Sequence, residues 1–332
     1  MDKLNVAVVG IGAMGKNHAR VCSSIKNVNL VAVCDTNENT AKEISEKYNT
    51  KCYLDCKRML AKEIVDAVSV CVPTKLHKEV AIGIIKKGIN VLVEKPIATT
   101  VSEAKEIINE AKKKNVKLMI GHIERFNPVV IELKKRIMRN ELGKIYKVHS
   151  VRLSQFPKRV IDVGVIVDLA IHEIDILKYL VDSKIKRVFA ETAQRIHSLH
   201  EDLLIGTIRF ENSILGVINA NWLTPKKVRE ITVTREKGMF VANYLSQELY
   251  FYEKEFAQKS VDYNKKFIYG SEGKKTKIKI INSEPLKNEL ISFVDCIRKN
   301  KEPLVTGQDG LEALDIAQKL KQSAKENRVI SI

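Results

Sequence analysis

The feature that most constrains the fold is a regular alternation of short apolar runs and amphipathic stretches over the first 121 residues. The apolar runs are rich in β-branched residues and have the length of strands; they span residues 5–9, 30–35, 51–54, 67–72, 90–94 and 117–120. Stretches with helical spacing lie between several of them, at 40–48, 76–87 and 101–114. Buried strands that alternate with crossover helices predict an α/β fold with a doubly wound parallel sheet.

The pattern changes after Gly121. Helical segments at 128–139 and 168–181 are followed by a run of strands with turn residues between them, and helices from Pro285 and Gln308 close the chain. This order predicts an α+β unit in which helices cover one face of a large, mostly antiparallel open sheet. We therefore expect two domains, residues 1–121 and residues 122–332.

Composition limits the classes of function. The chain has 332 residues, 45% of them hydrophobic, and the first apolar run begins at Asn5, so we expect a cytoplasmic protein with neither a signal peptide nor a membrane span. The net charge is +17, but the basic clusters are short and aromatic residues make up only 6% of the chain. An anionic small ligand is therefore favoured over nucleic acid.

The six cysteines do not have the spacing of a zinc site. Only Cys52 and Cys56 are close together, and neither a second pair nor a nearby histidine completes a ligand set. We expect free thiols and no metal ion.

A glycine motif, Gly10-Ile11-Gly12-Ala13-Met14-Gly15, follows the first strand and opens a helix. Gly10 suits a tight turn, Gly12 lets a pyrophosphate approach the backbone, and Gly15 allows close packing of helix and strand. Asp35 ends the second strand, at the distance expected of a carboxylate that binds ribose hydroxyls. A carboxylate repels a 2′-phosphate, so the sequence predicts a Rossmann-type site for NAD rather than NADP.

Two further signals lie where strands of this sheet end. After the fourth strand come Pro73, Thr74 and His77; the alternative for Thr74 is a helix cap. After the fifth come Glu94 and Lys95, and a lysine beside a nicotinamide is suited to proton transfer, whereas the alternative is a surface lysine in a turn.

Asp168 and His172 form the last signal, at i,i+4 spacing in a predicted helix. A carboxylate can fix the tautomer of a histidine and so orient an acid–base pair. The alternative is an acidic residue near a helix start and a histidine in the core.

The glycine motif, the Glu94-Lys95-Pro96 tripeptide and the Asp168/His172 pair, in this order, resemble the Gfo/Idh/MocA oxidoreductases. The likeness extends to the segment from Pro285 to Leu290 and to the turn from Pro303 to Gly310. Two local segments, 121–128 and 162–169, resemble the branch of this family that oxidises UDP-N-acetylglucosamine at C3. The chain departs from the wider family at 163–165 and at Ala170, where glycines are common.

The resemblance implies roles for individual residues. Lys95, Asp168 and His172 match the catalytic set, and Pro73, Thr74 and His77 match the segment beside the nicotinamide ribose. The resemblance also places Arg125 and Asn127 where the chain passes from the cofactor domain into the substrate-binding cleft. From charge and position we add Lys158 and Arg159 as partners of a diphosphate; the alternative for both is a solvated loop.

The resemblance thus implies NAD-dependent oxidation of a nucleotide sugar, by an enzyme that forms a homodimer or homotetramer through its second sheet. Two alternatives stay open at this point. The substrate could be another sugar or a polyol such as an inositol, or the chain could bind dinucleotide as a regulator without catalysis.

Overall fold

The computed structural model describes residues 3–157, 163–196, 199–254 and 273–332. Their packing divides the chain into two compact units, one formed by Met1–Phe126 and Ser283–Ile316 and the other by Asn127–Asn282 and Ala317–Ile332. From the sequence we expected all residues after 121 in the second domain. Residues 283–316 instead pack with the first unit, because Leu286, Leu290 and Phe293 are buried in its core.

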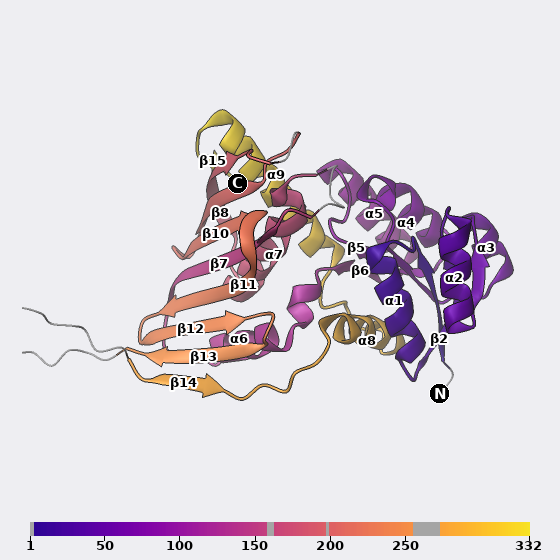
Figure 1. Ribbon diagram of the computed structural model, residues 1–332, viewed down its shortest axis with the longest axis horizontal. Coiled ribbons are helices and arrows are strands. Elements are labelled where there is room, and N and C mark those ends of the chain that lie inside the picture. The colour runs from indigo at the N-terminus through magenta and orange to yellow at the C-terminus, as the bar shows by residue number, and fades with distance from the viewer. Residues whose placement is uncertain (1–2, 158–162, 197–198, 255–272) are drawn as a thin grey trace, which may run out of the picture. The chain divides into compact units, whose positions relative to one another are not determined.

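The first unit is built on a six-stranded sheet, drawn in indigo and purple in Figure 1. Its strand order is β3-β2-β1-β4-β5-β6, with every neighbouring pair parallel. The strands are β1 (Leu4–Val9), β2 (Val28–Cys34), β3 (Lys51–Tyr53), β4 (Ala67–Val70), β5 (Asn90–Glu94) and β6 (Leu118–Gly121). The α-helices are α1 (Ala13–Ser24), α2 (Glu38–Tyr48), α3 (Cys56–Lys62), α4 (His77–Ile85), α5 (Val101–Lys114) and α8 (Pro285–Arg298), with short 3-10 turns at Thr74–Leu76 and Ile123–Phe126.

Helices cover both faces of this sheet. α1 packs beside α2 and α8, and α4 packs beside α3 and α5. The central strands β1 and β4 are buried over almost their whole length, as expected for strands covered on both sides. Because all six strands are parallel, the segments that follow β1, β4 and β5 lie at one edge of the sheet, where ligands bind in folds of this class.

The second unit contains a nine-stranded sheet in the order β14-β13-β12-β11-β7-β10-β9-β8-β15. Its strands are β7 (Ile145–Gln155), β8 (Ile185–Ala193), β9 (Leu203–Phe210), β10 (Leu215–Asn221), β11 (Leu223–Arg235), β12 (Gly238–Asn243), β13 (Glu248–Glu253), β14 (Lys275–Ile278) and β15 (Ile330–Ser331). Among the described pairs, β7 and β10 run parallel and the others are antiparallel.

Helices α6 (Pro128–Met138) and α7 (Ile171–Val181) pack against this sheet and against each other. Burial alternates along the strands beneath them: in β10, Gly216, Ile218 and Ala220 are buried, whereas the residues between are more exposed. The helix α9 (Gly307–Glu326) precedes β15. The sheet is thus covered on one face, as the alternating pattern predicts.

The predicted fold class is confirmed: a doubly wound parallel sheet is followed by a largely antiparallel one. All six cysteines are free, as expected. Among the described residues, no helix combines the length and the apolar character needed to cross a bilayer.

Candidate active site

The glycine loop after β1 leaves open space where a ligand can approach the backbone. Gly10 has a φ of +86°, and a Cβ built there would lie 2.6 Å from the Val72 nitrogen. A Cβ on Gly15 would lie 1.8 Å from the Gly10 oxygen. A Cβ on Gly12 would meet nothing within 4 Å, so this side of the loop is open. Gly10 thus occupies a tight turn and Gly15 a tightly packed position, and the approach of a pyrophosphate at Gly12 stays a prediction.

Helix α1 begins directly at this loop with Ala13 and Met14. Its N-cap is Gly12, which has no side chain to cap the helix, and its first turn holds no acidic residue. The first N–H groups and the positive end of the helix dipole are therefore available to an anion. The loop and the helix start fit the pyrophosphate of NAD.

Asp35, directly after β2, lies beside the same loop. Its carboxylate accepts hydrogen bonds from the Ile11 N–H at 2.6 Å and from the Asn37 N–H at 2.8 Å. These bonds hold the two oxygens in place and leave further lone pairs for the ribose hydroxyls of NAD.

The segment with Lys95 follows β5. Lys95 is half-buried, its peptide bond to Pro96 is cis, and its N–H donates to Oε2 of Glu94 at 3.1 Å. The Glu94 side chain is buried and Oε1 lies 2.9 Å from Nε2 of His18. The carboxylate of Glu94, which was predicted to bind cofactor, thus contacts His18 and the main chain of Lys95.

His77 connects this segment to the one that follows β4. Its ring is buried, with Nδ1 2.8 Å from the Pro96 oxygen and Nε2 2.9 Å from the Val72 oxygen. Burial lowers the pKa of His77 below its ordinary value, against the opposing effect of these carbonyl groups. Its position between two carbonyl groups makes His77 a residue that holds the two segments together.

Pro73 and Thr74 begin the 3-10 turn between β4 and α4. The alternative role of Thr74 as a cap of the following helix is not seen, since the N-cap of α4 is Leu76. A role beside the nicotinamide ribose remains a prediction for both residues.

In the second unit, Asp168 lies in a π-helical turn, Ile166–Ala170, that leads directly into α7, where His172 is in the first turn. From the sequence we expected one regular helix beginning at Asp168. A π turn closes from i to i+5, so the spacing between Asp168 and His172 is not that of a regular α-helical turn. Such turns are frequent at functional sites.

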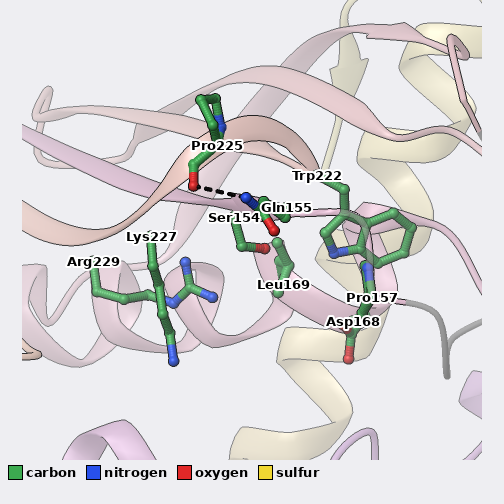
Figure 2. Close-up of a pocket in the computed structure, with 9 residues that line it drawn as sticks. All are labelled: Ser154, Gln155, Pro157, Asp168, Leu169, Trp222, Pro225, Lys227 and Arg229. Atoms are coloured by element: carbon green, nitrogen blue, oxygen red, sulfur yellow. Dashed lines mark hydrogen bonds between the residues drawn. The ribbon is translucent and has the colours of Figure 1, made fainter.

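Asp168 lines a pocket of about 430 Å³ in this unit (Figure 2). Lys227 and Arg229, two residues apart on β11, lie on one side of it, and Trp222 lies with Asp168 on the other. The remaining lining residues are Ser154, Gln155, Pro157, Leu169 and Pro225, of which Gln155 donates from Nε2 to the Pro225 oxygen at 3.2 Å. His172 is not among the described residues that line the pocket.

Two of the residues predicted to bind substrate form hydrogen bonds with other residues of the protein. Arg125 is 4% exposed and donates to Asp309 Oδ1 at 2.9 Å. Burial would raise the pKa of Asp309, but Arg125 and the Thr306 hydroxyl hold it below its ordinary value. Asn127 caps α6 and donates to the Tyr244 oxygen at 3.1 Å.

Lys158 and Arg159, predicted as diphosphate partners, lie outside the described residues. The described part of the second unit offers Lys227 and Arg229 at the pocket instead, and sequence reasoning missed both. It also missed Glu289, which is buried on α8 between Leu286 and Leu290. An acidic residue on an apolar helical stripe was the available signal for Glu289.

A doubly wound sheet with this glycine loop and a carboxylate after β2 defines the class of NAD-dependent oxidoreductases. Residues 4–122 match the family model of the oxidoreductase family with an NAD-binding Rossmann fold, and residues 134–332 match the model of its C-terminal alpha/beta domain. The chain belongs to the Gfo/Idh/MocA oxidoreductase family. It is an enzyme that uses NAD to oxidise a CH–OH group of a sugar or polyol.

Several known relatives align with most of the chain. It is 25% identical to the myo-inositol 2-dehydrogenase of Thermotoga maritima, over 99% of this chain and 98% of that protein. It is 26% identical to the UDP-N-acetylglucosamine 3-dehydrogenase of Acidithiobacillus ferrooxidans, over 76% and 78%. A solved structure of UDP-N-acetylglucosamine 3-dehydrogenase from Acidithiobacillus ferrooxidans has a TM-score of 0.87 at 24% identity, covering 98% of this chain and 99% of that one. The last comparison shows the shared fold.

Proposed function

We propose that this chain oxidises the C3 hydroxyl of UDP-N-acetylglucosamine to the 3-keto sugar nucleotide. The observation that carries the proposal is the pocket of the second unit, in which Asp168 shares the lining with two cations, Lys227 and Arg229. A sugar nucleotide brings a diphosphate that these cations would bind, whereas a free inositol or hexose brings no charge. The net charge of +17 agrees with an anionic substrate.

The reaction removes two hydrogens from a secondary alcohol, one from carbon with its electron pair and one from oxygen as a proton. Bound NAD supplies the acceptor for the hydride. The chain supplies the proton acceptor, and we assign this task to Lys95 and His172, with Asp168 orienting the imidazole. The Lys95 ammonium would also stabilise the oxygen as it gains negative charge, an interaction stronger in the transition state than in the ground state.

Identification of the product tests the substrate. Purified chain is incubated with NAD and UDP-N-acetylglucosamine, NADH release is followed by absorbance, and the sugar is analysed by mass spectrometry for loss of two hydrogens and by NMR for a ketone at C3. myo-Inositol, scyllo-inositol and N-acetylglucosamine are assayed in parallel. Turnover of an inositol with no reaction of the nucleotide sugar would assign the chain to the polyol dehydrogenases, which the similarity to myo-inositol 2-dehydrogenase makes the second candidate.

The pocket cations make a separate prediction. We expect Lys227→Met to raise the KM for the nucleotide sugar about tenfold or more, because a charge-assisted contact to the diphosphate is lost, and to leave kcat within about threefold. The neighbouring Lys226 is also exposed but does not line the pocket, so Lys226→Met is the matched control. Equal KM values for the two variants would remove Lys227 from the substrate site.

We also propose that a second copy of the chain covers the open face of the nine-stranded sheet, in a homodimer or homotetramer. In adjacent strands of this face, Ile205 and Leu215 are exposed by 41% and 44%, and Val217 lies half-buried between His149 and Thr207. A partly apolar sheet face of this kind is stabilised when another surface covers it. Sedimentation velocity should show a dimer or larger species for the wild type and a smaller one for Val217→Lys; a monomeric wild type would contradict this assembly.

A further inference from the structure

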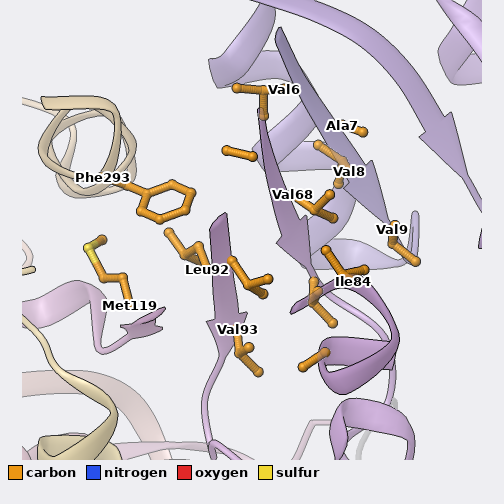
Figure 3. Packing of buried hydrophobic residues seen from close by; sticks show 14 of the residues in the cluster. Val6, Ala7, Val8, Val9, Val68, Ile84, Leu92, Val93, Met119 and Phe293 are labelled. Atoms are coloured by element: carbon orange, nitrogen blue, oxygen red, sulfur yellow. The ribbon is translucent and has the colours of Figure 1, made fainter. Parts of the chain in front are cut away.

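Three ionisable side chains are buried together in the first unit. His18 comes from α1, Glu94 from the end of β5 and Glu289 from α8, and their exposed fractions are 0%, 8% and 0%. One side-chain nitrogen or oxygen atom of each of these residues lies within 4.8 Å of the corresponding atoms of the other two. Helix α8 contributes Glu289 although it lies near the end of the chain, because its apolar face packs on the parallel sheet: Figure 3 shows the Phe293 ring pointing toward Leu92 and Met119.

Hydrogen bonds connect His18 and Glu94 to the main chain of Lys95. Nδ1 of His18 lies 2.6 Å from the Ser69 hydroxyl and Nε2 lies 2.9 Å from Oε1 of Glu94. Oε2 of Glu94 accepts the Lys95 N–H at 3.1 Å. When His18 carries both ring protons, each is donated to an oxygen, and Glu94 is the acceptor that links the imidazolium to the Lys95 segment.

Glu289 differs from the other two. Both of its carboxylate oxygens are buried and have no hydrogen-bond partner among the described residues. A buried carboxylate without a partner is strongly unfavourable, and the nearest charge of its own kind is Glu94. A protonated carboxyl group avoids both costs and carries an O–H, and Glu94, with an oxygen within 4.8 Å, is the acceptor toward which that O–H can turn.

The charges around the cluster agree with this assignment. The other ionisable groups that face the cluster are Cys22 on α1, Cys71 after β4, His77 on α4 and Lys95 after β5. Burial and the neighbouring Glu94 raise the pKa of Glu289 well above its ordinary value of 4.5. Burial would lower the pKa of His18, but Cys71 and Glu94 raise it, and burial would raise the pKa of Glu94, but His18 holds it down. The cluster then has no net charge.

We infer that Glu289 is a positioning residue for Lys95: it keeps its proton in the folded protein, donates it to Glu94, and so keeps the Glu94 carboxylate in place to hold the Lys95 N–H. This inference rests on the proposed role of Lys95. Gly121, the partner of Glu94 on strand β6, has no side chain, and a Cβ there would lie 3.1 Å from Cδ and Oε2 of Glu94. A side chain larger than that of glycine at position 121 would therefore press on the Glu94 carboxyl group.

Two substitutions that keep the approximate size of the Glu289 side chain test whether it acts as a hydrogen-bond donor or only fills space. Glu289→Gln keeps a neutral side chain that can donate to Glu94, and Glu289→Met fills the same space without a donor. With the substrate that the wild type oxidises, we expect Gln to keep kcat within about threefold and Met to lower it about tenfold or more, both with NAD affinity within about twofold of the wild type. If Glu289 had only a structural role, the Gln and Met variants would have the same kcat whenever their NAD affinity is unchanged.

The pH dependence of stability tests the proton directly, without a substrate. Because folding raises the pKa of Glu289, the folded protein holds a proton there that the unfolded chain releases above its ordinary pKa of 4.5. Wild-type stability that comes from this group is therefore present at low pH and is lost as the pH rises. Glu289→Gln cannot titrate, so its Tm relative to the wild type should rise by about 2 °C or more between about pH 5 and pH 8.

Three results would overturn the inference. One is a Tm difference between Glu289→Gln and the wild type that stays constant across this pH range. Another is equal kcat for the Gln and Met variants. The third is about one divalent ion per purified chain that a chelator removes together with stability, which would make the three side chains a metal site. If the Met variant does not fold, Gly121→Ala replaces it: a methyl group that presses on the Glu94 carboxyl group should lower kcat about tenfold with NAD affinity unchanged, and wild-type kcat would count against the positioning role.

Failure of the proposed function is distinguishable from failure of this inference. If the proposed function is wrong, the wild-type chain would bind NAD and would not oxidise the nucleotide sugar. The Tm measurements need no substrate and decide the protonation of Glu289 in either case.

Discussion

Replacing Lys95 by methionine should lower turnover by about 10²–10⁴-fold while NAD affinity stays within about tenfold of the wild type. Methionine keeps the length of the side chain and removes the ammonium group, which we propose as a proton carrier and as the positive charge that stabilises the reacting oxygen. The hydrogen bond from the Lys95 N–H to Glu94 belongs to the main chain, so the backbone of the segment should be kept.

Steady-state kinetics with the identified substrate and titration of NAD by protein fluorescence measure the two quantities separately. Lys86→Met, at an exposed position after α4, is the matched control and should behave as the wild type. A Lys95→Met variant with turnover near that of the control would show that this lysine has no part in the chemical step.

The second large effect is expected at His172. We expect His172→Ala to lower kcat by about 10²–10⁴-fold, because the proposed acid–base partner of the hydroxyl is removed, and to change NAD affinity by less than about threefold. The loss should be similar in kcat and in kcat/KM, as expected for an interaction that acts mainly in the transition state.

The control for this variant is His200→Ala, since His200 is a half-buried histidine just before β9 of the same unit. Turnover and thermal unfolding are measured for both variants, so that a loss of folding is not taken for a loss of catalysis. If His172→Ala retained wild-type turnover, proton transfer would have to be assigned to Lys95 alone.

The two candidate substrates make different demands on the second unit. A polyol needs hydrogen-bonding groups only, whereas a sugar nucleotide also needs cations for its diphosphate and space for its base. The pocket has both Asp168 and the cations Lys227 and Arg229, and Nη1 of Arg229 is held by the Leu153 oxygen at 2.7 Å and the Val228 oxygen at 2.8 Å. An Arg229 substitution would therefore disturb the strand as well as the site, which is why Lys227 is the better test.

The first sheet was largely predictable because its determinants are local. Each strand is a short β-branched run and each helix has its own periodicity, so β5 and α5 begin and end at the predicted residues 90–94 and 101–114. The glycine loop was predictable for the same reason. Its function depends on backbone freedom at fixed positions, and the glycines at positions 10 and 15 can be read directly from the sequence.

The second unit was predictable in class but not in detail. The turn after Phe210 and the helix from Pro128 were expected and are present. The π turn around Asp168 was not expected, because one extra residue in a helical turn leaves no distinct signal in the apolar pattern.

The sequence by itself thus determined the order of strands and helices, the dinucleotide loop and the residue types proposed for proton transfer, since these follow from short-range periodicity and from positions where one residue type is required. Only the tertiary structure showed that Glu289, far along the chain, is buried against Glu94 and His18, and that the pocket cations are Lys227 and Arg229. Contacts between distant residues depend on how helices and strands pack, and packing is a property of the whole fold that no local pattern records.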